Sequence, residues 1–187
     1  MPLLSYWDDE DNNILPSFAQ KSSTVKDILD LLSLSGKLPN ATIDKEQRLP
    51  LGTSGDYYPL KDQITFHPLT GNTPSVGAHE LFHALQARMG NKAYNLNKSW
   101  RSDLSTSDLQ YLDAYEKLNN GGAIKNQPEE GYRTRLDEAQ AFGVGNYATG
   151  QRPTWETEYS SKRPHLDATN ASEMAILMDL YKRTFKK

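Results

Sequence analysis

The pattern His79-Glu80-Leu81-Phe82-His83 constrains this chain of 187 residues more than any other feature. Residues four apart lie one above the other on a helix face, so the two imidazoles can bind one ion from consecutive turns. Glu80 follows His79 at about 100° around the helix, which brings its carboxylate near the open side of that ion. The pattern therefore predicts a helix with two metal ligands, His79 and His83, and a general base, Glu80.

The residues around this pattern favour a helix. Pro74 and Ser75 suit a first turn, and Met89-Gly90-Asn91 supplies a C-terminal stop. Apolar residues recur between these ends at helical spacing, namely Ala78, Phe82, Leu85 and Met89. We therefore expect a helix over about residues 74–89 that packs with one face and binds metal with the neighbouring face.

A catalytic zinc site has three protein ligands and a water, so a third ligand should lie downstream. Small residues follow Glu138 and would let a second helix approach closely enough for its carboxylate to reach the metal. We predict Glu138 as this ligand, with Glu129 and Glu130, which also suit a helix-dipole role, as alternatives. Asp137 is a candidate for the hydrogen bond that orients a metal-bound histidine, and His165 would be the fourth ligand of a closed structural site.

The rest of the chain is predicted to form a mainly helical frame. We expect helices over residues 24–34, 107–118, 128–148 and 171–185, and a short strand over residues 62–66. The strand is a candidate edge strand beside the cleft, where a peptide could pair with it. His67, at its end, is expected in a loop and not at the metal. The predicted fold is one α+β domain over residues 1–187, mainly α-helical with a small sheet, after a flexible lead-in over residues 1–16.

Composition narrows the possible ligands and partners. The chain has no cysteine, so the available ligands are histidines and carboxylates, and no disulfide is possible. A net charge of −3 gives no general attraction to nucleic acid. No segment approaches the ~18 apolar residues that a membrane span needs, and the first residues lack a cleavable signal pattern. We expect a monomer whose partner is a protein or peptide.

A longer set of residues resembles the NleD-type effector zinc peptidases of bacteria and the metallopeptidase toxin domains of polymorphic toxins. The set comprises Val76–Leu85, Gly90, Glu129–Thr134, Glu138–Ala141, Asn146, Gly150, Arg152 and Pro153. The similarity covers roughly residues 64–163. Where the family has an Asn-Arg pair followed by Gly and Arg, this chain has Asn146-Tyr147 and then Gly150-Gln151-Arg152.

The resemblance implies a zincin-like fold and a zinc ion held by His79, His83 and Glu138. It also implies a bacterial protein that is secreted by a route without a signal peptide and cleaves a protein inside a host or competitor cell. A secretion-system carrier, or an immunity or chaperone protein, would then be a further partner.

The residues themselves predict zinc-dependent peptide hydrolysis in which Glu80 takes a proton from the attacking water. Such an enzyme benefits from a donor to the oxyanion of the tetrahedral intermediate. Three tyrosines are candidates: Tyr132, Tyr147 and Tyr159. The alternative function is a non-catalytic binding or toxin-accessory module with a structural or vestigial zinc site.

Overall fold

The computed structural model describes residues 15–46, 48–95, 104–106, 108–109, 136–150 and 171–186. Its helices and strands are, in chain order, α1 (Leu15–Lys21), α2 (Ser23–Ser35), β1 (Asn40–Ile43), β2 (Gly55–Tyr58), the 3-10 turn η2 (Pro59–Lys61), β3 (Gln63–Phe66), α3 (Pro74–Asn95), α6 (Leu136–Thr149) and α8 (Ala171–Phe185). The fold is therefore α+β, rich in helix with a small sheet, as predicted.

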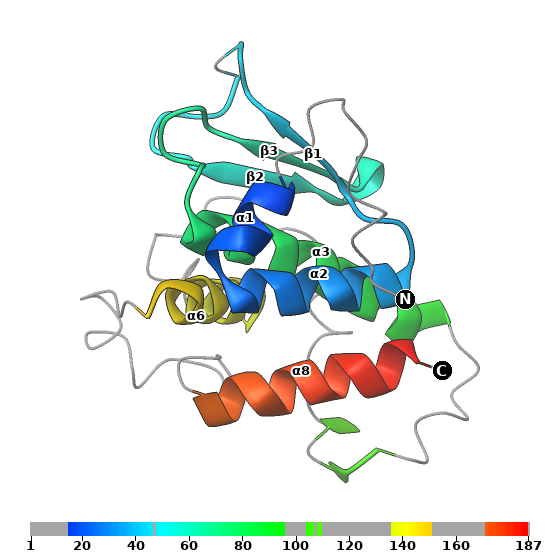
Figure 1. Cartoon of the computed structure of the whole chain (residues 1–187). Coiled ribbons are helices and arrows are strands. Elements are labelled where there is room, and N and C mark those ends of the chain that lie inside the picture. The colour runs from blue at the N-terminus through cyan, green and yellow to red at the C-terminus, as the bar shows by residue number, and fades with distance from the viewer. Residues whose placement is uncertain are drawn as a thin grey trace.

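The helices gather on one side of the sheet. In Figure 1 the sheet lies above the helices, and α8 lies below α2, on the side of the helices that faces away from the sheet. Helix α3 is central, because it packs against α6, α2, α1 and strand β2. Among the described residues, no helix combines the length and hydropathy that a membrane span requires.

Helix α3 forms where the sequence predicts it, and its apolar face is fully buried. The buried residues are Ala78, Leu81, Phe82, Ala84, Leu85 and Met89. The predicted stop at Gly90 is wrong, because α3 continues to Asn95. A glycine ends a helix by taking a positive φ, and Gly90 is buried and does not take one. The packing around it outweighs the roughly 1 kcal/mol that an interior glycine costs relative to alanine.

The other predicted segments differ in how well they match the structure. Helix α8 has the predicted bounds. Helix α2 is one residue longer than predicted at each end, and it stops before Gly36, which has a φ of 145°. The predicted lead-in is too long by two residues, since Leu15 is buried and begins α1. Residues 1–14 and 128–135, and most of the predicted helix over 107–118, lie outside the described residues.

The sheet has the order β1-β3-β2, with β1 parallel and β2 antiparallel to β3. The predicted strand exists, but it begins at Gln63, because Asp62 takes a left-handed conformation with a φ of 47°. It is also the central strand, so the expectation that it borders the cleft is wrong. Strand β2 occupies that edge and packs against α3.

Close packing of α6 on α3 depends on Gly145. A Cβ at this position would lie 2.8 Å from the carbonyl oxygen of Ser75 and 3.5 Å from Cβ of His79. Real Cβ atoms essentially never come within 3.0 Å of such atoms, so any side chain here must push the two helices apart. Gly145 therefore sets the distance between the two helices.

We expect Gly145→Ala to lower the free energy of unfolding by about 1–3 kcal/mol, the usual cost of overpacking. Tyr147→Ala is the matched control, because Tyr147 is exposed on the same helix. Urea titrations of both variants measure the difference. Equal midpoints would contradict a tight contact between α3 and α6.

Candidate metal centre

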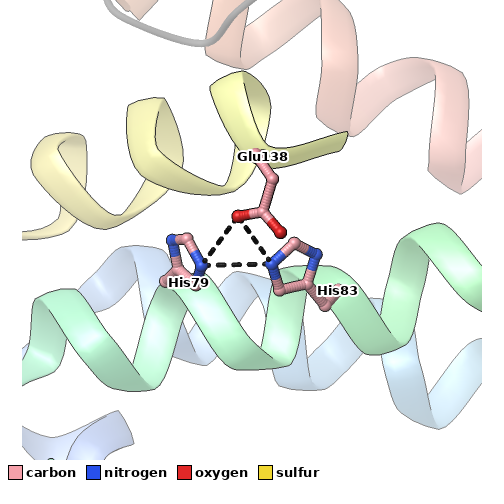
Figure 2. A group of neighbouring side chains, drawn as sticks. All are labelled: His79, His83 and Glu138. Atoms are coloured by element: carbon pink, nitrogen blue, oxygen red, sulfur yellow. Dashed lines mark hydrogen bonds and ion pairs between the residues drawn. The ribbon is translucent and has the colours of Figure 1, made fainter. Parts of the chain in front are cut away.

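Helices α3 and α6 bring His79, His83 and Glu138 together. Figure 2 shows the two imidazoles on consecutive turns of α3 and the carboxylate pointing between them from α6. The Nε2 atoms of the histidines are 3.1 Å apart. Oε2 of Glu138 lies 3.6 Å from Nε2 of His79 and 3.5 Å from Nε2 of His83. All three ligand atoms therefore surround one point, as the sequence predicted.

The electrostatics of this group favour a bound cation. Glu138 is only 6% exposed, and its Oε2 is buried without a hydrogen-bond partner among the described residues. A buried carboxylate oxygen in that position is unfavourable unless a charge or a donor compensates it. A metal ion at the centre of the triangle compensates it, so His79, His83 and Glu138 are positioned to bind a metal ion.

Gln86 orients His83. Nδ1 of His83 donates to Oε1 of Gln86 at 2.8 Å, which directs the other ring nitrogen toward Glu138. The amide nitrogen of Gln86 donates in turn to the backbone carbonyl of Asp137 at 2.8 Å and to Oε1 of Gln140 at 3.3 Å. The sequence predicted that the Asp137 carboxylate orients a metal-bound histidine. For His83, Gln86 makes that hydrogen bond instead. The sequence could have indicated this role, because Gln86 follows His83 by three residues and so lies on the same face of the helix.

Phe142 restrains the other histidine. Its ring lies edge-on to the imidazole of His79, with 4.5 Å between the centroids. Aromatic rings at this distance and angle attract each other, so the contact favours one orientation of the ligand. Each histidine of the pair thus has a neighbour that orients its ring.

The side chain of Glu80 extends from α3 toward strand β2, and only 6% of the residue's surface is exposed. Its carboxylate lies near the backbone N–H of Tyr57. A Cβ on Gly55 would lie 2.7 Å from Cγ of Glu80, so β2 can pass this side chain only with a glycine at that point. Burial, with the charges of Glu138 and Asp56, raises the pKa of Glu80 to about 7, although His83 and the Tyr57 amide oppose the rise.

A cavity lies on each side of His79 and Glu80. One, of about 250 Å³, is bordered by residues 55–57 of β2 and by Gln86, Asp137 and Glu138. The other, of about 380 Å³, is bordered by residues 52–55, Ser75, Val76, Phe142 and Gly145. Both cavities include Gly55, His79 and Glu80, so the candidate centre is reached from two directions.

The remaining candidates have different outcomes. His67 lies in a loop, as predicted, where its Nδ1 accepts the backbone N–H groups of Leu69 and Thr70 at 3.2 and 3.3 Å. Tyr147 is exposed and borders neither cavity. Five further candidates lie outside the described residues: Glu129, Glu130, Tyr132, Tyr159 and His165.

Comparison of the chain with models of protein families, with curated proteins and with solved structures found no match. The kind of site can therefore be inferred only from the residues that form it. Two histidines and a carboxylate converge on one point, and a buried glutamate stands beside them in a cleft.

We expect His79→Ala, His83→Ala and Glu138→Gln to weaken metal binding far more than Gln86→Leu does. Loss of an orienting partner typically weakens metal affinity roughly 10–100-fold, whereas loss of one of three ligands removes a coordination bond. Calorimetric titration with Zn²⁺ as the probe ion measures the series. His67→Ala is the control and should bind like the wild type; unchanged affinity in a ligand variant would exclude that residue.

Metal affinity should rise with pH. Burial lowers the pKa of His83, but the Glu138 carboxylate outweighs that effect and, with Glu80, raises the pKa to about 9. The imidazole must lose this proton before it can bind a metal, so affinity should fall about tenfold for each pH unit below the pKa. Competition titrations at pH 6 and pH 8 test the slope. The same affinity at both values would contradict it.

Proposed function

We propose that the chain is a zinc-dependent endopeptidase that hydrolyses peptide bonds of a protein substrate. The observation that carries the proposal is the position of Glu80, which directly follows one ligand of the candidate metal centre and lies buried in the cleft beside all three. A purely structural metal site has no need for a buried carboxylate that is not a ligand.

The donor set and its spacing support zinc as the metal. Tetrahedral bonds of about 2.0–2.1 Å to zinc place neighbouring ligand atoms roughly 3.3 Å apart. The three distances in the group, 3.1, 3.5 and 3.6 Å, lie near this value. Two histidines with one glutamate are also a ligand set of catalytic zinc sites, which keep a further position for water.

Zinc, when bound, supplies Lewis-acid chemistry that polarises a carbonyl and makes water more acidic. Glu80 accepts the proton from the attacking water on its carboxylate and passes it to the nitrogen of the leaving amine. Burial, which raises the pKa of Glu80, favours the first transfer because it makes the carboxylate a stronger base. Strand β2 passes against the Glu80 side chain at Gly55, which limits the movement of the carboxylate during both transfers.

The shape of the cleft supports cleavage within a chain. Cavities on both sides of His79 and Glu80 leave room for substrate residues on either side of the scissile bond. Strand β2 borders both cavities, and an extended peptide can add to such an edge through backbone hydrogen bonds. With the resemblance to NleD-type peptidases, this supports a bacterial effector or toxin that is delivered into another cell, with a carrier or immunity protein as its partner.

We expect Glu80→Gln to retain Zn²⁺ affinity and fold while lowering turnover at least 10²–10⁴-fold, the usual contribution of a general base. A proteome-wide cleavage profile with a chelator-treated sample identifies the substrate peptides on which kcat is then measured. Glu46→Gln is the control, since the side chain of Glu46 is 73% exposed.

Full activity in Glu80→Gln would overturn the mechanism. A wild-type protein that binds zinc tightly and cleaves nothing in the profile would favour the alternative function, a non-catalytic binding or toxin-accessory module.

A further inference from the structure

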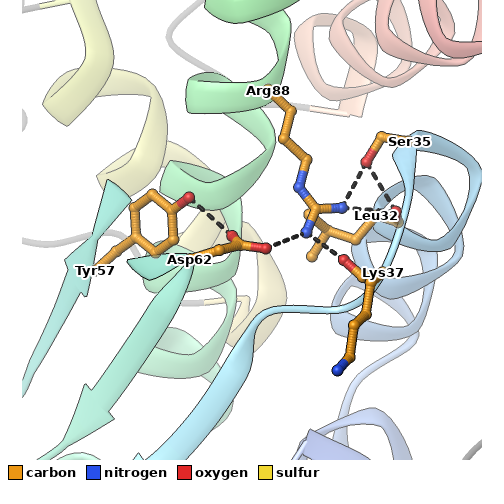
Figure 3. A network of polar contacts seen from close by, with 6 residues as sticks. All are labelled: Leu32, Ser35, Lys37, Tyr57, Asp62 and Arg88. Atoms are coloured by element: carbon orange, nitrogen blue, oxygen red, sulfur yellow. Dashed lines mark hydrogen bonds and ion pairs between the residues drawn. The ribbon is translucent and has the colours of Figure 1, made fainter. Parts of the chain in front are cut away.

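A network of polar contacts connects α3 with α2 and with the turn between β2 and β3 (Figure 3). At its centre is Arg88, which is on the same helix as His79 and His83. Nη1 of Arg88 donates to the carbonyl of Leu32 at 2.8 Å and to Oγ of Ser35 at 2.7 Å. Nη2 donates to the carbonyl of Lys37 and to Oδ2 of Asp62 at 2.7 Å. The guanidinium therefore joins three segments that are distant in the sequence.

Asp62 extends the network to strand β2. Its Oδ1 accepts the hydroxyl of Tyr57 at 2.9 Å, while its backbone N–H donates to the carbonyl of Pro59 at 3.3 Å. The backbone N–H of Asn40 donates to the carbonyl of Asp62 at 2.9 Å. Burial and the Asp62 carboxylate raise the pKa of Tyr57, so its hydroxyl remains a donor. The turn is thus fixed to β1, to β2 and, through Arg88, to α3.

Tyr57 also completes a path back to Glu80. Its hydroxyl donates to Asp62, and its backbone N–H lies near the Glu80 carboxylate, where β2 passes Glu80 at Gly55. Helix α3 consequently holds β2 at two points about two helical turns apart, directly at Glu80 and through Asp62 at Arg88. Two points fix both the distance and the direction of a short strand, whereas one point would let it pivot.

We propose that Arg88 and Asp62 are positioning residues of the peptidase: they hold β2 where its Tyr57 amide and Gly55 fit around Glu80. The inference rests on the function proposed above. It differs from a purely structural ion pair, because it assigns the pair an effect on turnover and on one backbone amide rather than on stability alone. Arg88 makes its contacts to Leu32, Ser35, Lys37 and Asp62 and not to His79, His83 or Glu138, so metal affinity should not depend on them.

The test compares Arg88→Met and Asp62→Asn with the wild type. Asparagine tolerates the left-handed backbone of position 62, so that variant removes the charge without straining the turn. Because displacements of about 1 Å can lower rates about 100-fold, we expect kcat to fall roughly 10–100-fold, with KM and Zn²⁺ affinity changing less than about threefold. Arg88→Lys keeps a cation for Asp62 and should recover part of kcat.

A second readout does not need catalysis. The Tyr57 amide lies near Glu80 where β2 packs against α3, so its hydrogen exchange should be slow, and both variants should speed it by about tenfold or more. Arg183→Met is the matched control, since it breaks an arginine–aspartate contact of 3.1 Å to Asp108 far from β2. It should lower stability without changing kcat or Tyr57 exchange.

The two readouts separate the possible failures. Wild-type kcat and wild-type Tyr57 exchange in both variants would overturn the positioning role. Loss of zinc together with activity would also overturn it, since the network would then support the whole centre. If the wild type cleaves no peptide, the peptidase proposal fails on its own, and the exchange data still decide whether Arg88 and Asp62 hold β2.

Discussion

The candidate centre depends on the close approach of two helices. Glu138 has a short side chain, and it reaches the histidines only because α6 lies almost against α3. Gly145 permits that approach beside Ser75 and His79, and Gln86 maintains it by donating to the backbone of Asp137. Both distances from Glu138 to the histidines follow from this packing, so the core and the site cannot be varied independently.

The same packing creates an uncommon concentration of buried charge. Glu80, Glu138 and His83 lie together with little solvent. Burial raises the pKa of Glu80, and for His83 the Glu138 and Glu80 carboxylates outweigh burial and raise the pKa. Such shifts occur mainly where a protein uses its charges chemically. Here the acid that follows a ligand retains a proton up to about neutral pH, and the histidine beside it holds one well above neutral pH. Both groups therefore hold a proton to a higher pH than usual, which suits a site in which a cation replaces one proton and a base moves another.

Features that follow from local spacing were predictable. His79, Glu80 and His83 are set by helical periodicity, and α8 has the bounds that its sequence pattern predicts. Glu138 required an argument about bulk at a helix contact, and the structure agrees with it. Strand β2 was missed because Gly55 and Asp56 are poor strand formers, and only the fit around Glu80 explains the glycine. Arg88 and Asp62 were missed because their role exists only through tertiary contacts.

The separation of the ligands along the chain has a consequence for stability. A metal ion held by His83 and Glu138 would close the chain between α3 and α6 into a loop, much as a disulfide does, in a protein that has no cysteine. A permanent cross-link over a loop of this length lowers the conformational entropy of the unfolded chain and so raises its free energy by about 4 kcal/mol. An ion that binds only the folded chain would instead add stability that grows with its free concentration, so α3 and α6 would be held together more firmly when the metal is supplied than when it is withdrawn.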